Sequence, residues 1–251
     1  MSDATTRFTG RADHYARHRP LYPAALLETL VAEAGLRPQD VVADVGAGTG
    51  ILSELLLRHG NAVIAVEPNA SMRAGLGPLR QAWPALRVTD GASEATVLPD
   101  ASVDVVVAGQ AFHWFDPVRT KREFARILRP GGRIALVWNV RDKTSTPFLR
   151  GYEAMLDRHA PDYARLKAGP IDLPVLEAFF APRGFQARSF PYDTVYDLAG
   201  LEGLLRSTSY APQPGHPAHA PMLAELGRLF AANAPGGTVT MQYQTRLFFS
   251  A

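Results

Sequence analysis

The sequence predicts an α/β fold built on a doubly wound, mostly parallel sheet, and two features lead to this prediction. Short apolar, β-branched runs alternate along the chain with amphipathic helical patterns, as in consecutive βαβ units. In the clearest unit, an apolar run from Val41 to Val45 ends in a glycine-rich turn, and a leucine-rich helical pattern begins at Ile51. With 251 residues, the chain can form one such domain with a small appendage.

Composition limits the class of protein. Hydrophobic residues make up 47% of the chain and charged residues 20%, which is typical of a folded, soluble protein. The 26 basic and 24 acidic residues leave a net charge of +2, which does not by itself indicate a nucleic-acid partner. The absence of cysteine excludes disulfides, thiolate nucleophiles and cysteine-ligated metals. Residues 1–10 lack an apolar signal core and no run of about 18 apolar residues occurs, so we expect a cytoplasmic protein without a membrane partner.

The glycine-rich turn is Asp44-Val45-Gly46-Ala47-Gly48-Thr49-Gly50, and its spacing favours one kind of ligand. Gly46 permits the positive φ of a sharp turn, Gly48 leaves room for a ligand against the backbone, and Gly50 lets the helix start close to the sheet. Unpaired N–H groups at the helix N-terminus suit a carboxylate or a phosphate. In dinucleotide-binding proteins the last glycine lies one residue later. The carboxylate of Asp44 would also repel a pyrophosphate, but it would accept hydrogen bonds from an ammonium group.

This turn resembles motif I of the class I S-adenosylmethionine-dependent methyltransferases. The resemblance implies a Rossmann-like sheet of seven strands whose last strand is antiparallel, with a helical cap over the substrate. It also implies S-adenosyl-L-methionine as the cofactor, with Asp44, Gly46, Ala47 and Gly48 among the residues that bind it.

The segment before the first strand has a second resemblance to this family. The spacing of Tyr15, Arg19, Pro20, Tyr22 and Pro23 is similar to the N-terminal segment that many small-molecule methyltransferases fold over the cofactor. In that interpretation Tyr15 lies near the sulfonium, because a ring face attracts cations, and Arg19 holds a carboxylate. A solvated basic arm is the alternative. A helical pattern runs from Pro23 to residue 34 and is closed by a glycine.

The second strand, Ala62–Val66, ends in a carboxylate. Glu67 follows this wholly apolar run and lies seventeen residues after Gly50, a position from which it can accept hydrogen bonds from both hydroxyls of a ribose. An ordinary residue at the end of a surface strand is the alternative interpretation. A further helix begins after Pro68.

The third strand, Leu86–Asp90, leads into a loop that brackets adenine in the family. Members of the family often carry aspartate where this chain has Ala92, so Ser93 and Glu94 both remain candidates for the exocyclic amine. Plain loop residues are the alternative.

The fourth strand, Ser102–Gly109, should place the residues after it at the reaction centre, because ligands of open α/β sheets lie beyond the carboxyl ends of the strands. We therefore expect Gln110 to contact the cofactor, and His113 and Trp114 to face the methyl group and the substrate. His113 is suited to remove a proton at neutral pH. A buried aromatic cluster is the alternative.

An amphipathic helix is predicted from Val118 to Arg129, with its basic residues on the solvent face; nucleic-acid binding is the minority interpretation. A Pro-Gly turn and a fifth strand ending at Trp138 resemble a further motif of the family. Later helices are predicted at 148–159, 175–180 and 198–207, a strand at 184–192, a surface loop at 212–221 and an alternating last strand at 238–249.

Three parts of the chain follow from these patterns. Residues 1–35 form an arm and helix that close over the cofactor, and residues 36–140 form the cofactor-binding core. Residues 141–251 form helical cap insertions and the last two strands. We expect a roof over the substrate from Arg206, Ser207, Ser209 and Tyr210.

The expected activity is transfer of a methyl group from S-adenosyl-L-methionine to a small-molecule substrate, with an oxygen, nitrogen or carboxyl acceptor. His113, Tyr15 and Trp114 are the catalytic candidates, and Arg19 is the candidate for binding a carboxylate acceptor, which would need no base. A nicotinamide-dependent oxidoreductase and a non-catalytic nucleotide-binding module are the alternatives. No metal-ligand cluster is visible, and the sequence lacks the Asn/Asp-Pro-Pro-Tyr/Phe motif of enzymes that methylate amines of nucleic acids. The acceptor and the oligomeric state stay open.

Overall fold

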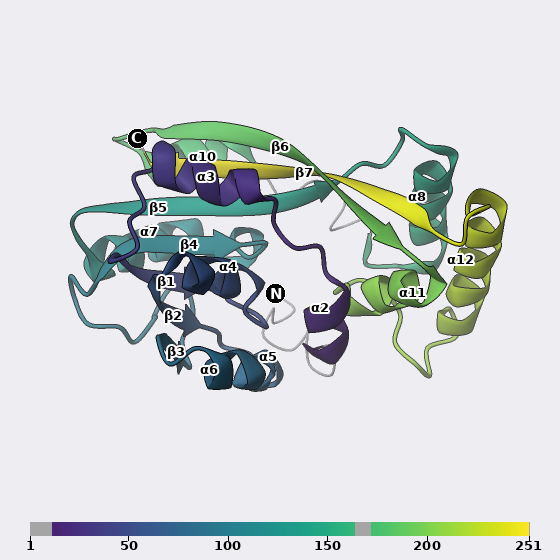
Figure 1. The fold of residues 1–251 in the computed structure, drawn as a ribbon, viewed down its shortest axis with the longest axis horizontal. Coiled ribbons are helices and arrows are strands. Elements are labelled where there is room, and N and C mark those ends of the chain that lie inside the picture. The colour runs from purple at the N-terminus through teal and green to yellow at the C-terminus, as the bar shows by residue number, and fades with distance from the viewer. Residues whose placement is uncertain (1–11, 164–171, 251) are drawn as a thin grey trace.

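The computed structural model describes residues 12–163 and 172–250. These residues form one seven-stranded sheet in the order β3-β2-β1-β4-β5-β7-β6 (Figure 1). Strands β1 to β5 pair in parallel, and β7 is antiparallel to both of its neighbours, β5 and β6. The strands are β1 (Val41–Val45), β2 (Ala62–Val66), β3 (Leu86–Thr89), β4 (Val103–Gly109), β5 (Leu128–Arg141), β6 (Phe185–Tyr196) and β7 (Val239–Ser250). The predicted fold class, including the antiparallel last strand, is confirmed.

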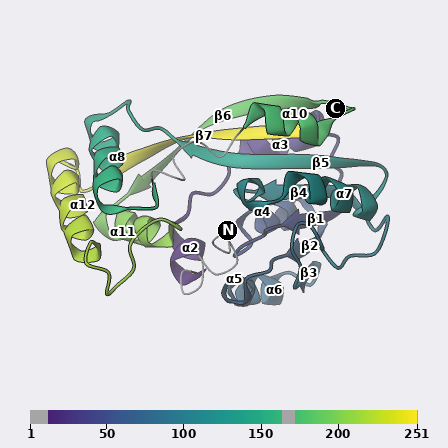
Figure 2. The ribbon, with the colours of Figure 1, turned by 180° about the vertical axis from the view of Figure 1, so that it is seen from behind.

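Helices cover both faces of this sheet. On one face, α3, α4 and the α5–α6 segment pack against residues such as Val42, Val63 and Val107. On the other face, α7 and α10 pack against Ala43 and Trp138 (Figure 2). The helices of the described residues are α2 (Ala12–His18), α3 (Ala24–Ala32), α4 (Ile51–His59), α5 (Ala70–Gly75), α6 (Gly77–Ala82), α7 (Pro117–Ile127), α8 (Pro147–His159), α10 (Leu173–Phe180), α11 (Leu198–Ser207) and α12 (His219–Asn233), with a 3-10 turn, η1 (Phe112–Trp114).

A separate apolar core lies under the helical cap. Helices α8, α11 and α12 pack together and against the parts of β6 and β7 that extend beyond the rest of the sheet. Figures 1 and 2 both show these three helices grouped at one end of the molecule, with α2 beside α11. The arm before β1 therefore lies between the sheet and the cap. No helix among the described residues is long and apolar enough to cross a membrane.

Two element boundaries and one close approach differ from the prediction. Helix α12 begins at His219, inside the predicted loop, because a proline at position 221 is tolerated in the first turn of a helix. Strand β5 already pairs at Leu128, before the Pro-Gly turn, and the turn becomes an irregularity within the pairing with β4. At Gly50, an added Cβ would lie 2.6 Å from Leu76 and 2.7 Å from Leu79. The close approach there is to the α5–α6 segment rather than to the sheet.

Candidate active site

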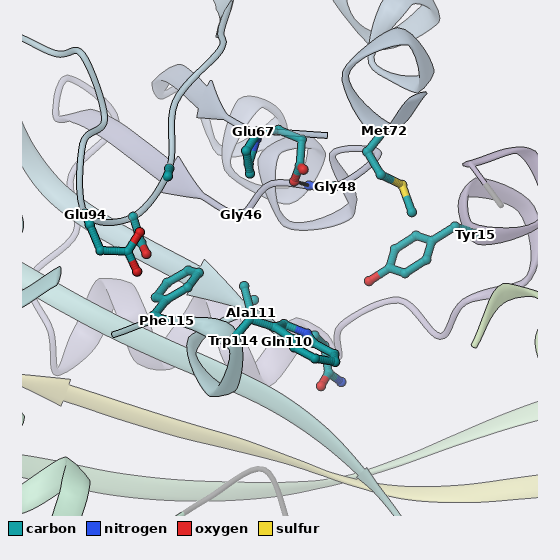
Figure 3. Close-up of a pocket in the computed structure, with 14 residues that line it drawn as sticks. Tyr15, Gly46, Gly48, Glu67, Met72, Glu94, Gln110, Ala111, Trp114 and Phe115 are labelled. Carbon is teal, nitrogen blue, oxygen red and sulfur yellow. Dashed lines mark hydrogen bonds between the residues drawn. The ribbon is translucent and has the colours of Figure 1, made fainter. Parts of the chain in front are cut away.

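The carboxyl ends of β1, β2 and β4 surround a cavity of about 750 Å³. Figure 3 shows Glu94 and Phe115 at one end of this cavity, Tyr15 and Met72 at the other, and Glu67 between them. We call it the first cavity. Its position beyond the strand ends is the one predicted for a ligand in an open α/β sheet.

A smaller second cavity adjoins the first. The two share Tyr15, Gly109 and Gln110, and the second is also lined by Asp44 and Arg19. The turn after β1 and the arm before it therefore meet around one continuous space.

The glycine-rich turn is fixed by hydrogen bonds within the protein. The backbone N–H groups of Gly46 and Ala47 donate to the carbonyl of Val66 at 2.8 and 3.2 Å, and the N–H of Gly48 donates to Glu67 Oε2 at 2.8 Å. Neighbouring residues therefore accept the hydrogen bonds of these three N–H groups of the turn, and the expectation of an anionic group at the N-terminus of α4 stays a prediction. Gly46 has a φ of 73°, and an added Cβ would lie 2.6 Å from Ala111, so the predicted need for glycine holds there.

Asp44 is a buried carboxylate with one oxygen in use. Ser53 donates its hydroxyl to Asp44 Oδ2 at 2.6 Å, whereas Oδ1 has no hydrogen-bond partner among the described residues. The pKa of Asp44 is raised from 3.8 to about 7, mainly by burial and also by the charge of Glu67, while the Ser53 hydrogen bond opposes the shift. A cationic group placed beside Oδ1 would both complete its hydrogen bonding and favour the ionised form.

Glu67 is held by two backbone groups at the end of β2. Its Oε2 accepts from the N–H of Gly48 and its Oε1 from the N–H of Asn69, each at 2.8 Å. Each carboxylate oxygen can accept more than one hydrogen bond, so both can still bind a ligand hydroxyl. Burial raises the pKa of this carboxyl, and the two N–H groups limit the increase. The predicted diol-binding carboxylate therefore lines the first cavity in a fixed orientation.

The three candidate residues of the loop after β3 have different hydrogen-bond partners. Ala92 pairs with Ala95 through two backbone hydrogen bonds of 3.1 Å, which close the loop. The Ser93 hydroxyl accepts from Thr120 at 3.1 Å. Glu94 Oε1 accepts from the N–H of Asp116 at 2.9 Å, which leaves the other oxygen of this cavity-lining residue open. Of the two candidates that the sequence left open for the exocyclic amine, the structure favours Glu94.

Gln110, directly after β4, lies where the cavities meet. Its φ of 58° is unusual for a residue with a side chain, and hydrogen bonds from its backbone N–H to Val137 (2.8 Å) and from its side chain to the carbonyl of Asn139 (3.0 Å) hold it there. It lines the first and second cavities. The prediction that the first residue after this strand faces the ligand thus agrees with the geometry.

His113 and Trp114, the aromatic pair after Gln110, lie in different environments. Trp114 lines the first cavity, as does Phe115, which the sequence analysis did not single out. His113 is exposed and does not line either cavity, although its ring centre lies 4.9 Å from that of Trp114. Desolvation by the surrounding protein and the charge of Arg19 lower the pKa of His113 from 6.5 to about 4. The ring is therefore neutral at pH 7.

Tyr15 and Arg19 bring the arm to the site. The Arg19 guanidinium lies 4.8 Å from the centre of the Tyr15 ring and donates to the carbonyl of Ser207 in the cap at 3.3 Å. Arg19 makes no ion pair with a carboxylate of the described residues, and its buried Nε has no hydrogen-bond partner among them. Its guanidinium therefore lies beside the second cavity without an ion-pair partner among the described residues.

The predicted roof is only partly at the site. Tyr210 lines a third cavity under the cap, described below. Arg206 instead forms an ion pair with Glu202 at 3.3 Å, and the buried Ser207 hydroxyl donates to the carbonyl of Leu204 at 2.5 Å. The sequence analysis also missed Arg141, which ends β5. The rule that strand ends face the ligand could have found it, had it been applied to the fifth strand.

The sheet order, the antiparallel β7 and cavities at the strand ends define a Rossmann-like methyltransferase fold. The chain is similar, over 92% of its length and 96% of the other chain, to the structure of a proposed type II methyltransferase from Anaeromyxobacter dehalogenans, with a TM-score of 0.57 and 24% identity. The YcgJ protein of Bacillus subtilis gives a TM-score of 0.55 at 19% identity and covers 90% of this chain and 97% of its own. These likenesses bear on the fold alone.

Sequence comparison gives the family. Residues 43–136 match the model of the methyltransferase domain. The uncharacterized methyltransferase-like protein C25B8.10 of Schizosaccharomyces pombe is 30% identical over 215 residues, which are 83% of this chain and 79% of the relative. The uncharacterized methyltransferase Rv3342 of Mycobacterium tuberculosis is 43% identical over 141 residues, 56% of this chain, and the match spans only 55% of that relative's length. The chain belongs to the S-adenosylmethionine-dependent methyltransferase superfamily.

Proposed function

We propose that this protein transfers a methyl group from S-adenosyl-L-methionine to a small-molecule acceptor. When bound, that cofactor supplies an electrophilic methyl group attached to a positively charged sulfur. The sulfur becomes a neutral thioether when the methyl group is transferred. The observation that carries the proposal is the placement of carboxylate oxygens with open hydrogen-bonding capacity on Asp44, Glu67 and Glu94, which line adjoining cavities.

These carboxylates match the polar groups of the cofactor. Asp44 offers its unpartnered Oδ1 to the ammonium of the amino-acid portion, and Glu67 offers both oxygens to the ribose diol. Glu94 offers its open oxygen to the adenine amine, and Ser93, which lines the same cavity, offers its backbone N–H to a ring nitrogen. Phe115 supplies an apolar wall at the same end of the first cavity.

On the acceptor side, the chain's proposed contribution is alignment. Holding two reactants in line can account for roughly 7 to 11 kcal/mol of the barrier. Tyr15 and Trp114 line the first cavity and Gln110 lies at its junction with the second, so these residues are placed to restrict the approach of the acceptor. His113, the predicted base for a hydroxyl or amine acceptor, lines neither the first nor the second cavity, and its pKa of about 4 makes it a weak base.

Two observations weigh against other functions. A nicotinamide-dependent oxidoreductase would place a pyrophosphate at the turn where Asp44 is buried and where the N–H groups of Gly46 and Gly48 are already bonded. Part of the basic face of α7 is used within the protein. Arg126 is paired with Asp100 and Glu123, and the Lys121 ammonium donates to two backbone carbonyls of the α10 segment.

Calorimetry with S-adenosylhomocysteine and NAD tests the proposal. We expect S-adenosylhomocysteine to bind and NAD not to bind. Glu67→Gln should weaken S-adenosylhomocysteine binding by about 10- to 100-fold, because a hydrogen bond to a charged acceptor contributes about 1.5–3 kcal/mol. Glu54→Gln is the matched control, since Glu54 lies on the exposed face of α4, paired with Arg58. Unchanged affinity in Glu67→Gln would remove Glu67 from the site, and binding of NAD alone would overturn the proposal.

A further inference from the structure

A third cavity lies under the cap and adjoins the second. The space between its atoms is about 460 Å³, part of which is open to solvent. It shares Arg19, Pro20 and Gln110 with the second cavity. We call it the cap cavity. Its walls come from the arm, the end of β5, α8, α11 with the turn after it, and β7. Gln110, which lines all three cavities, marks where a molecule under the cap would meet the cofactor site.

The charged groups of the cap cavity are both cationic. Arg19 and Arg141 line it, and no aspartate, glutamate or histidine of the described residues does. The charge of Arg141 is balanced by Glu153, whose Oε2 lies 2.6 Å from Arg141 Nη2, and the guanidinium is stacked 4.8 Å from the centre of the Tyr152 ring. The charge of Arg19 is not balanced by an ion pair with any of the described residues. The cavity therefore carries about one positive charge without a counter-ion, which favours an anionic occupant.

The neutral groups of the cap cavity are mainly hydrogen-bond donors. Tyr152, Tyr210 and Tyr243 line it, and each hydroxyl can donate a hydrogen bond, whereas the Asn139 amide is bonded to Leu21 and Thr245. Burial raises the pKa of Tyr152 and of Tyr243 above the ordinary tyrosine value, so their hydroxyls stay protonated at neutral pH. No group of the described lining can take a proton from an acceptor at that pH, because the remaining ionisable groups are guanidiniums. An acceptor bound here must therefore be nucleophilic without first losing a proton to the protein.

We infer that the cap cavity binds the methyl acceptor and that this acceptor is a carboxylic acid, bound as its carboxylate and released as a methyl ester. The inference rests on the proposed function. A carboxylate oxygen forms the new O–C bond to the methyl carbon, while the C–S bond of the sulfonium breaks and its electron pair stays on sulfur. No proton moves, which matches a cavity without a base. Arg19 and the Tyr210 hydroxyl are the groups that orient the carboxylate.

The product's chemistry tests this inference. The protein is incubated with methyl-labelled S-adenosylmethionine and either a small-molecule extract of the source organism or a panel of small carboxylic acids, each paired with its primary amide. The inference predicts label in products that release methanol in mild base, from acids and not from the paired amides. Label that is stable to base, amides accepted as well as acids, or no base-labile label while S-adenosylhomocysteine still binds, would each overturn the inference. Failure of S-adenosylhomocysteine to bind would instead overturn the proposed function.

Tyr210→Phe tests the cavity itself with little risk to the fold, because the variant keeps the ring that lies 4.8 Å from the ring of Tyr163. We expect the KM for the acid to rise about tenfold, because the variant loses one hydrogen bond to a charged group. The kcat should change less, and the affinity for S-adenosylhomocysteine should not change. Tyr192→Phe is the matched control, since Tyr192 packs against the cap core and does not line the cavity. An unchanged KM in Tyr210→Phe would remove Tyr210 from the acceptor site.

Discussion

At the scale of single residues, the two buried carboxylates of the site differ in how completely the protein satisfies them. Glu67 accepts one backbone N–H at each oxygen, whereas Asp44 accepts only the Ser53 hydroxyl and keeps one buried oxygen without a partner among the described residues. Both pKa values are raised by burial, and that of Asp44 reaches about 7. The charge state of Asp44 therefore changes in the range where most assays are performed.

We predict that S-adenosylhomocysteine binds more tightly as pH rises toward neutrality. The folded-state pKa of Asp44, about 7, lies above its unfolded value of 3.8, so without ligand the protonated form is favoured and stability falls as pH rises between these values. A ligand ammonium favours the ionised form instead. Affinity should therefore fall by up to about tenfold per pH unit below pH 7, with proton release on binding. Calorimetry in buffers of different ionisation enthalpy measures both quantities.

Asp44→Asn is the control for this titration. The amide oxygen can still accept from Ser53, but the side chain no longer ionises. The variant should bind S-adenosylhomocysteine weakly and with an affinity that hardly changes between about pH 5 and 8. If the variant keeps the pH dependence of the natural protein, another group is responsible.

Single residues were predictable where a strand end fixed them. Glu67 and Gln110 follow from the rule that ligands lie at the carboxyl ends of parallel strands, and Asp44 follows from the spacing of the glycine-rich turn. The choice between Ser93 and Glu94 was not predictable, because it depends on Thr120 and Asp116, which the fold brings to the loop from the next helix. Likewise, the partners of the glycine-turn N–H groups depend on how β2 ends beside the turn.

At the scale of elements, the contact between α2 and α11 joins the arm to the cap. Tyr196, just before α11, donates its hydroxyl to the carbonyl of His18 at 2.9 Å. Gly203 of α11 faces the His18 ring so closely that an added Cβ would lie between 2.2 and 2.5 Å from three of its atoms. The arm that carries Tyr15 and Arg19 is therefore positioned by a glycine in the cap.

Gly203→Ala should displace the arm. We expect weaker S-adenosylhomocysteine binding and a higher KM for the acceptor, because Tyr15 and Arg19 line the cavities for both. The matched control is Gly227→Ala in α12, where an added Cβ meets no atom within 4 Å. Alanine there should leave both constants unchanged and raise stability by about 0.5–1 kcal/mol, the usual difference in a helix interior. Unaltered affinities in Gly203→Ala would show that the α2–α11 contact does not position the arm.

The elements of the core were more predictable than those of the cap. Strand β7 alternates as expected, with Val239, Met241, Tyr243, Leu247 and Phe249 all buried. The start of helix α12 was placed too late, because its first turn contains proline and histidine rather than a usual start signal. The cap cavity was not predictable, since its walls come from the arm, the end of β5 and helices far apart in the sequence.

At the scale of the whole molecule, three adjoining cavities run from the strand ends of the core to the space beneath the cap. Strands β6 and β7 extend beyond the other strands and carry the cap, as Figure 1 shows. The sheet therefore provides both the proposed cofactor site and the support for the helices around the cap cavity. The same arrangement places Gln110 and Arg19 between the two, where small displacements of the arm should affect both ligands.

A crystal structure with S-adenosylhomocysteine tests this account most directly. The account predicts the ribose hydroxyls on the Glu67 carboxylate, the ammonium beside Asp44 and the adenine amine at Glu94, with the sulfur turned toward Gln110 and the cap cavity. A ligand bound elsewhere, with these three carboxylates left without contact to it, would contradict the account.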